Sequence, residues 1–360
     1  MPGRRFLIVD HRDKEGNVIA VGIDTHKESL AVCAVDDLGR QLGELSVSNS
    51  PRGFRRLERF LASLATPRRV GIEGAGGLGA PLARALDVAG EEVVEVPARL
   101  TARERRRLRR LGKSDPADAL AIARVVVSEQ NLPVAIHGEL TTDLKVLCNY
   151  RAQLLGERTR QSNRLHADLA MLSPGYGAQL PAFDSAVRQR RAAALLAAQG
   201  GVRARLAERR LARILAIAAE IDALDRQITA LVGGCGTRLT AICGIGSLTA
   251  ARLLAECGDA RRFRSAAAFA MAAGVAPITA SSGKVQRHRL NRGGNRQLNL
   301  ALYTIAFVQS RCDPRAQDYL ARKRADGKSW REAMRCLKRQ LANVVYRQMV
   351  ADLNEGRLTT

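Results

Sequence analysis

Four carboxylates occur at positions where a metal site would need them. Asp24 and Glu73 each end a short apolar run, and each directly follows a glycine and an isoleucine. Asp115 and Asp118 open a predicted helix, where the i, i+3 spacing puts both on one face of the first turn. Four neighbouring acids repel one another unless cations neutralise them, and Mg²⁺ prefers such hard oxygen ligands. Two ions about 4 Å apart would hold the attacking and leaving oxygens of a phosphoryl displacement. We therefore interpret these four acids as catalytic residues and as ligands of Mg²⁺, with Mn²⁺ as an alternative ion.

Each acid also has a simpler interpretation when it is taken alone. Asp115 is well placed to cap a helix, and Asp24 is an ordinary polar residue at the end of a strand. The repetition of the pattern at the ends of two apolar strands favours the metal site. His26 is a candidate fifth ligand, but a histidine in a loop is more often simply solvated, so it is left out of the predicted site.

A second group of residues combines serine with many cations. It starts at Ser281-Ser282-Gly283 and continues with Lys284, Arg287, His288, Arg289, Arg292 and Arg296. A serine hydroxyl needs activation, but it can attack a phosphodiester where cations surround the phosphate. The glycine permits a tight turn that lets a nucleic-acid backbone approach. The alternative is a flexible basic loop that only binds phosphate, in which His288 acts either as a base or as a further phosphate donor.

The net charge indicates a polyanionic partner. The 360 residues include 58 Lys and Arg against 35 Asp and Glu, so the formal net charge is +23. A protein this basic usually binds nucleic acid, and arginine matches phosphate well. An arginine bias from a GC-rich genome is the alternative. We expect nucleic-acid contacts from the dense segment 98–112 and its continuation, through Arg103, Arg105, Arg106, Arg109 and Lys113.

The first third of the chain has an alternating α/β pattern. Three closely spaced apolar runs indicate an antiparallel meander. They are followed by helix, strand, helix and strand, so the expected ranges are 19–24, 30–35, 41–47, 53–64, 69–73, 81–89 and 92–96. This order is that of the ribonuclease-H-like fold.

The remainder of the chain is predicted to be helical. Two long helices, 140–172 and 203–231, flank a breaker at 174–177 and indicate a coiled-coil hairpin or dimerising arm. Residues 233–236 are the predicted linker to a final helical domain, which ends in a helix-rich tail over 331–349. Its segment 242–246, with the helix 248–256, resembles a helix-hairpin-helix turn, where backbone N–H groups can hold a phosphate. The expected domains are an extension at 1–17, a catalytic domain at 18–136, a coiled coil at 137–232 and a C-terminal domain at 237–350.

Cysteine usage and hydropathy exclude several other classes of protein. The seven cysteines form no C-x-x-C pair, so neither a disulfide framework nor a zinc site is expected. No apolar run approaches the roughly 20 residues of a membrane span. The apolar stretch near the N-terminus is too short for a secretory signal. We therefore expect a cytoplasmic protein with no membrane contact.

Two blocks of motifs, in register, resemble one family. Segments 22–27, 71–74 and 112–119, with 274–277, 281–284 and 291–296, resemble the conserved regions of the insertion-sequence one-hundred-and-ten family of bacterial transposases. The similarity spans about residues 20–347.

That resemblance implies a RuvC-like N-terminal domain, a coiled-coil connector and a helical transposase domain. It implies a Mg²⁺ site made of Asp24, Glu73, Asp115 and Asp118, and a nucleophilic serine. Of the adjacent pair, Ser282 fits the motif because it precedes the glycine. The serine would form a phosphoserine link to DNA, and strands would exchange through a Holliday-junction-like intermediate. A bridge RNA would pair with donor and target DNA, and dimers would assemble into a tetramer at the nucleoid of a bacterium.

Two other functions use the same residues differently. A junction resolvase or nuclease would use the four acids with water, and Ser282 would be expendable. A non-catalytic nucleic-acid-binding scaffold would need neither the acids nor the serine.

Overall fold

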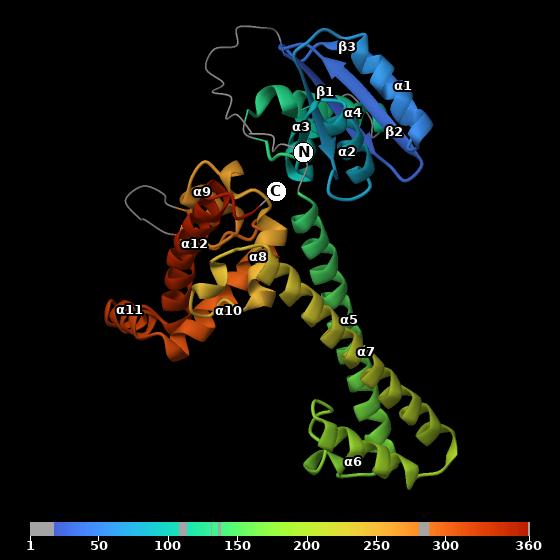
Figure 1. The fold of residues 1–360 in the computed structure, drawn as a ribbon, viewed down its shortest axis with the longest axis vertical. Helices are drawn as coiled ribbons and strands as arrows, with labels where there is room; N and C mark the ends of the chain where they lie inside the picture. Colours follow the sequence, from blue (N-terminus) through green and yellow to red (C-terminus); the bar gives the residue numbers. More distant parts are fainter. Residues whose placement is uncertain (1–17, 108–113, 131, 136–137, 281–287, 359–360) are drawn as a thin grey trace. The chain divides into compact units, whose positions relative to one another are not determined.

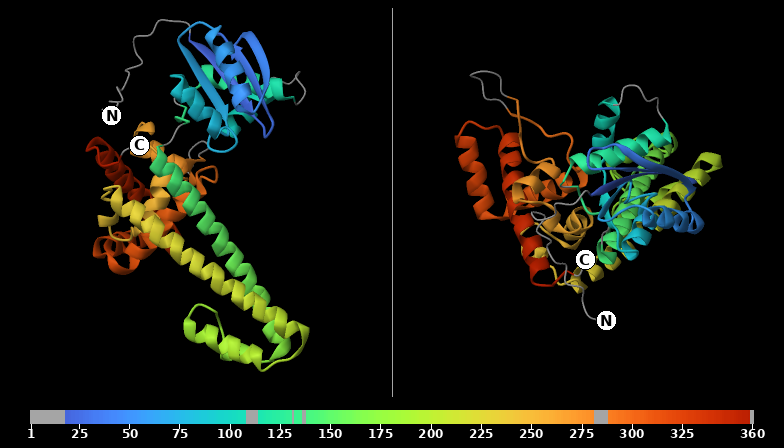
Figure 2. Two further views of the ribbon diagram at one scale, coloured as in Figure 1. Left: turned by 45° about the vertical axis from the view of Figure 1, so that its right-hand side comes forward. Right: turned by 90° about the horizontal axis from the view of Figure 1, so that it is seen from above.

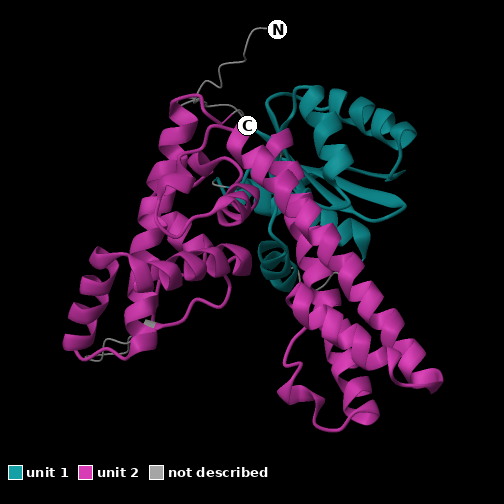
Figure 3. Ribbon diagram, turned by 60° about the horizontal axis from the view of Figure 1, so that its bottom comes forward, with its two compact units in different colours: residues 1–137 teal, residues 138–360 magenta. Residues whose placement is uncertain are grey.

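The computed structural model describes residues 18–107, 114–130, 132–135, 138–280 and 288–358. The chain separates into two compact units, residues 1–137 and 138–360 (Figure 3). Figures 1 and 2 show the path of the chain through each of them. Among the described residues, no helix is both long enough and apolar enough to cross a membrane.

The first unit is built on a five-stranded mixed sheet. Its strands are β1 (Ile19–Thr25), β2 (Ser29–Val35), β3 (Gln41–Ser48), β4 (Arg68–Glu73) and β5 (Glu92–Glu95), in the order β3-β2-β1-β4-β5. The first three strands form the predicted antiparallel meander, whereas β1, β4 and β5 run parallel. The predicted α/β character of this part of the chain is confirmed, and each strand lies within about a residue of its expected range.

Helices cover both faces of this sheet. On one face, Leu57 of α1 (Pro51–Ala62) and Leu82 of α2 (Ala80–Val88) pack with Ile23 and its neighbours. On the other face, α4 (Asp115–Ser128) packs its buried residues against Ala20 of β1, and Leu100 of α3 (Ala98–Arg107) joins the same cluster. Because side chains alternate along a strand, Asp24 lies on the α4 face, the same face as Ala20 and Gly22.

Two glycines let α4 lie directly on the sheet. A Cβ atom at Gly22 would lie 2.2 Å from the Ala119 carbonyl oxygen and 2.2 Å from the Ala123 amide nitrogen. At Gly71, the facing residue on β4, it would lie 2.3 Å from a methyl carbon of Val126. No side chain fits at either position, so the helix backbone comes closer to the sheet than a sequence with ordinary residues would permit.

The second unit begins with a long helical hairpin. Helices α5 (Glu139–Leu172) and α7 (Gly201–Gly234) pack side by side, and α6 (Ala186–Ala197) packs near their far end (Figure 1). The two predicted long helices are confirmed, whereas α6 was not predicted. The predicted linker at 233–236 is wrong in its first half, because α7 continues through Gly234. The buried seam extends to Ile228 and Val232, and its packing offsets the low helix propensity of the glycines.

Charged pairs tie the two helices of this hairpin together along its length. Arg151 pairs with Asp225, and an Arg213 nitrogen lies 2.5 Å from Glu157. Nearer the tip, Asp168 accepts hydrogen bonds from both Arg203 and Arg210. Residues early in α5 therefore meet residues late in α7, as expected for an antiparallel pair.

The rest of the second unit is helical and shares one apolar core. Its helices are α8 (Ser247–Cys257), α9 (Ala266–Ala272), α10 (Arg296–Cys312), α11 (Pro314–Ala325) and α12 (Trp330–Asn354). Two short strands, β6 (Ile278–Thr279) and β7 (His288–Arg289), pair antiparallel between α9 and α10. Before α8 the chain makes a tight turn, in which the Ile245 amide donates to the Ile242 carbonyl and Gly244 has a φ of 84°. The only helix that directly precedes this turn is the three-residue 3₁₀ segment Leu239–Ala241.

Candidate functional site

The first two predicted acids lie side by side on neighbouring strands. Asp24 of β1 is the register partner of Glu73 of β4, and the two strands run parallel. Both residues therefore lie at the carboxyl ends of their strands, the edge at which ligands bind in open α/β sheets. The Thr25 hydroxyl donates to the Glu73 carbonyl oxygen at 3.0 Å and holds the two strand ends together.

The other two acids open helix α4. Ser114 precedes the helix with extended backbone angles, and Pro116 occupies the first turn, as predicted. Asp115 and Asp118 both lie in that turn, where the positive end of the helix dipole stabilises carboxylates. Because Gly22 admits α4 to the face of β1 that carries Asp24, the helix brings its acids toward the strand ends.

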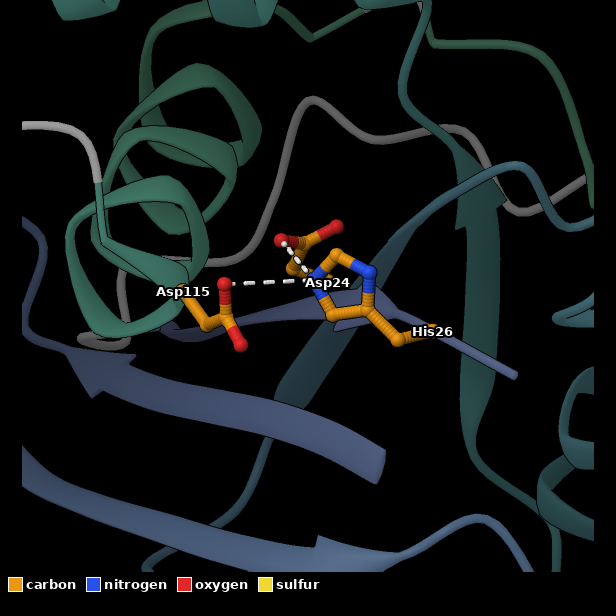
Figure 4. A group of neighbouring side chains, drawn as sticks. All are labelled: Asp24, His26 and Asp115. Atoms are coloured by element: carbon orange, nitrogen blue, oxygen red, sulfur yellow. Dashed lines mark ion pairs between the residues drawn. The ribbon is translucent and has the colours of Figure 1, made fainter. Parts of the chain in front are cut away.

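Asp24, Asp115 and His26 form a close group (Figure 4). The His26 Nε2 atom lies 3.2 Å from Asp24 Oδ2 and 3.3 Å from Asp115 Oδ1. One ligand atom from each of the three side chains lies within 4.8 Å of the others, a spacing that suits a metal ion. The sequence analysis left His26 out of the predicted site, whereas the structure brings it next to two of the predicted acids. Its position two residues after Asp24, directly after the end of the same strand, was the available signal.

Asp118 has two differently placed carboxylate oxygens. Its Oδ2 atom accepts a 2.9 Å hydrogen bond from Arg105 of α3. Its Oδ1 atom is buried and has no hydrogen-bond partner. An unpaired buried carboxylate oxygen is costly, and a bound cation would satisfy it.

The electrostatics of Asp24 reflect the whole cluster. Burial raises the pKa of Asp24 above its ordinary value, and His26 opposes that shift. The negative charges of Asp118, Glu73 and Asp115 raise the same pKa further, in that order. The other three predicted acids therefore all act on Asp24, and a divalent cation would relieve that repulsion.

This arrangement fits a divalent metal site. The available donors are carboxylate oxygens and one imidazole nitrogen, and one carboxylate oxygen has no hydrogen-bond partner. Among the described residues, Arg105 is the only arginine or lysine that pairs with one of the four carboxylates. Hard oxygen donors of this kind bind Mg²⁺ or Mn²⁺ rather than a thiophilic metal.

Comparison with known proteins identifies the chain. A family model for the DEDD transposases of IS110, described as "Transposase", matches residues 21–174. A second model, described as "Transposase IS116/IS110/IS902 family", matches residues 236–321. The chain belongs to the IS110 family of transposases. The first match contains all four acids, and the second contains the paired serines.

Full-length relatives agree with the assignment. An IS110 insertion-element protein of Streptomyces coelicolor is 29% identical, over 93% of this chain and 94% of its own length. An IS900 protein of Mycobacterium paratuberculosis is 27% identical, over 90% and 94%. A third relative, described as a mini-circle transposase for IS117 of Streptomyces coelicolor, is 29% identical, over 87% of this chain and 89% of its own length. The protein is therefore an enzyme of an insertion element, and the non-catalytic scaffold is excluded.

Two of the α3 arginines that are expected to bind nucleic acid contact acids of the transposase itself. Arg103 lies 2.6 Å from Glu129, and Arg105 is committed to Asp118. Arg106 is exposed and forms no ion pair with any described residue. Arg109 and Lys113 lie outside the described residues.

The serine segment of the transposase lies between β6 and β7. Ser281, Ser282, Lys284 and Arg287 fall outside the described residues, and of His288 only the backbone is described. Arg289, Arg292 and Arg296 are exposed in the second unit. The paired strands fix the two ends of the segment, with Thr279 opposite His288.

Proposed function

We propose that this transposase cuts and rejoins DNA by attack of Ser282 on a phosphodiester, at a Mg²⁺ site formed by Asp24, Glu73, Asp115 and Asp118. The proposal is carried by one observation: four carboxylates from two strands and a helix converge at one sheet edge, with a buried Asp118 oxygen unpaired. When bound, the ions would neutralise the phosphate and stabilise the charge that develops during displacement.

The protein's own residues would hold the ions and orient the ligands. Asp24 and Glu73 would provide ligands from the sheet edge, while Asp115 and Asp118 would provide ligands from the first turn of α4. We propose His26 as an additional donor, with Mn²⁺ as the ion that it would favour. Arg105 would hold the Asp118 carboxylate in one orientation, which makes it a positioning residue.

The nucleophile would come from the second unit. The Ser282 oxygen would form a bond to phosphorus, and the bond from phosphorus to the neighbouring sugar oxygen would break. The serine proton would be released, and the leaving sugar oxygen would take up a proton. Reversal of this phosphoserine link, with a different sugar oxygen attacking, would rejoin the strand and permit exchange through a Holliday-junction-like intermediate.

The sheet order and the strand directions of the first unit support a ribonuclease-H-like, specifically RuvC-like, catalytic domain over residues 18–136. We propose residues 137–232 as the dimerisation arm, 237–350 as the transposase domain, and 1–17 as an extension. We further propose that a bridge RNA selects donor and target DNA, that dimers assemble into a tetramer, and that the reaction takes place at the nucleoid in the bacterial cytoplasm. The turn before α8 would hold a phosphate in the manner of a helix-hairpin-helix.

A metal-dependent resolvase or nuclease is the second candidate. It is favoured by one observation, namely that the acid cluster is complete within the first unit. Water would then replace the serine as the nucleophile, and no covalent protein–DNA intermediate would form.

A strand-transfer assay separates the two candidates. It uses purified protein, Mg²⁺, the element's non-coding RNA, and donor and target DNA. The variants are Ser282→Ala, Ser281→Ala as its matched control, and Asp24→Asn. The proposal expects a covalent adduct and recombinant product from wild type and Ser281→Ala, and neither from the other two. Cutting by Ser282→Ala at the wild-type rate would assign the protein to the nucleases. Adduct formation by Asp24→Asn would remove the metal site from the mechanism.

A further inference from the structure

A basic cavity of about 670 Å³ lies in the second unit beside the β6–β7 pair. Pro277 and Arg289, which flank the serine segment on either side, both line it, and its opposite wall comes from α12. Cavities of this volume hold small molecules or one to two nucleotides. The cavity is therefore large enough to hold part of a nucleic-acid strand.

The charge of this cavity is strongly unbalanced. Its lining includes six cationic side chains, namely Arg289, Arg292, Lys328, Arg335, Lys338 and Arg339. Its one carboxylate, Glu332, is already engaged at the start of α12, where it accepts hydrogen bonds from the Ser329 amide and hydroxyl at 2.9 and 2.7 Å. None of the six cations forms an ion pair with any described residue, and residues 281–287 contain no Asp or Glu. The lining thus carries six cations against one carboxylate, an excess of positive charge that favours an anionic ligand.

Helix α12 aligns three of these cations. Arg335, Lys338 and Arg339 are spaced i, i+3 and i+4, which places them on one face of the helix. Lys338 is half-buried and donates to Asn299 Oδ1 at 2.9 Å, so its position is fixed. Burial lowers the pKa of Lys338, and the neighbouring charge of Arg335 lowers it further. Holding such groups together is unfavourable unless an anion lies between them.

An aromatic surface continues from this cavity. A second hollow of about 410 Å³ shares Lys338 and Arg292 with the first and is bordered by Tyr303 of α10. Tyr303 is 45% exposed, its ring stacks on Phe307, and the Lys338 ammonium lies 5.8 Å from the ring centre. An exposed ring beside cations is the usual platform for an unpaired base.

We propose that the cavity and the adjoining hollow, together called the basic groove, bind the DNA strand that the transposase cuts. Arg335, Lys338 and Arg339 would hold its phosphates, and Tyr303 would stack on an unpaired base. The inference rests on the proposed function for the choice of DNA, because the groove is bounded by the residues that flank the serine segment. It adds to that function a binding surface on α12, a helix that begins after the matched segment 236–321 ends.

Binding without catalysis tests the proposal. Fluorescence anisotropy would measure the affinity of the full-length protein, in EDTA, for a labelled duplex spanning the element's end, over a range of salt concentrations. The test variant is Arg335→Gln/Arg339→Gln. The matched control is Arg324→Gln/Arg347→Gln, which removes two exposed arginines that do not line the groove. Thermal melting of each variant verifies that it is folded.

The proposal expects about a tenfold weaker affinity for the test variant. The slope of log affinity against log salt concentration should be shallower by about 1.8, since each lost phosphate contact removes about 0.9. The control pair should retain near wild-type values. Tyr303→Leu should weaken binding of a single-stranded DNA probe by about fivefold or more, with a smaller effect on the duplex.

Two outcomes would overturn the proposal. One is equal losses for the test and control pairs, which would reflect net charge alone. The other is a loss confined to an RNA probe of the same sequence, which would assign the groove to RNA. Because EDTA prevents metal-dependent cutting, either outcome leaves the proposed function standing. Asp24→Asn should bind DNA like wild type in the same assay even though it transfers no strand.

Discussion

The contact between Gly22 and α4 makes a sharp prediction about the acidic site. In Gly22→Ala, the new methyl carbon would lie 2.2 Å from the Ala119 carbonyl oxygen and from the Ala123 amide nitrogen. Both are backbone atoms, so no rotamer change relieves the clash. Ordinary contact requires about 3.4 Å, and α4 would therefore have to move by about 1 Å.

Such a movement has two measurable consequences. Overpacking of this kind costs about 1–3 kcal/mol, which lowers the melting temperature of a domain this size by about 4–10 °C. The displaced helix carries Asp115 and Asp118, and ligands must stay within about 0.5 Å of their working positions. We therefore expect Mg²⁺ affinity to fall by about tenfold or more, with a parallel loss of strand transfer.

Calorimetry would measure melting temperature and Mg²⁺ affinity on the same samples. Gly77→Ala is the matched control, because a Cβ atom there would meet only the Gly74 carbonyl oxygen, at 3.5 Å. It should change the melting temperature by about 1 °C at most. If Gly22→Ala matched this control in both measurements, the close approach of α4 would be refuted. A destabilised Gly22→Ala with unchanged Mg²⁺ affinity would show that α4 does not carry the ligands.

Three further predictions concern His26, Arg105 and Cys257. His26→Ala should lower Mn²⁺ affinity by about tenfold and Mg²⁺ affinity less, because imidazole suits the softer ion; equal losses by titration calorimetry would count against His26 as a ligand. Arg105→Gln should lower the melting temperature of the metal-free protein by about 3 °C and weaken Mg²⁺ binding, since Asp118 loses the guanidinium that fixes its orientation; unchanged or tighter Mg²⁺ binding would contradict the positioning role. Burial raises the pKa of Cys257 from 9.0 to about 12. The folded protein therefore keeps this thiol protonated where the unfolded chain loses the proton, and its contribution to stability is lost as pH rises from about 9 to 12. At mildly alkaline pH, iodoacetamide should label exposed Cys243 and spare Cys257, and rapid labelling of Cys257 in native protein would argue against its burial.

Local patterns in the sequence were sufficient to predict most of the elements. Strands such as Ile19–Thr25 are short apolar runs, and the long helices α5 and α7 carry a clear apolar repeat, so periodicity identified them. Helix α6 was missed because its run of alanines and arginines has little apolar contrast. The end of α7 was misplaced because glycines normally stop a helix, and only tertiary burial of Val232 explains why they do not here.

The candidate site depends on contacts that no local pattern contains. Residue type and position at strand ends were enough to select Asp24 and Glu73, but their pairing is a matter of strand register. The approach of α4 depends on the missing side chain of Gly22, and the Arg105–Asp118 pair joins two helices. The contribution of α12 to the basic groove was unpredictable for the same reason, since Arg335 lies far along the chain from the serine segment.

The division of the chain into two units has a consequence for its synthesis. The four acids lie in residues 1–137, and the paired serines lie in residues 138–360. Domains fold largely as units during translation, the N-terminal one first. On the proposed mechanism, a ribosome-bound chain would acquire its metal site before its nucleophile exists. A truncated or interrupted product would be unable to form the covalent DNA link, so incomplete translation would leave the host chromosome uncut by this route.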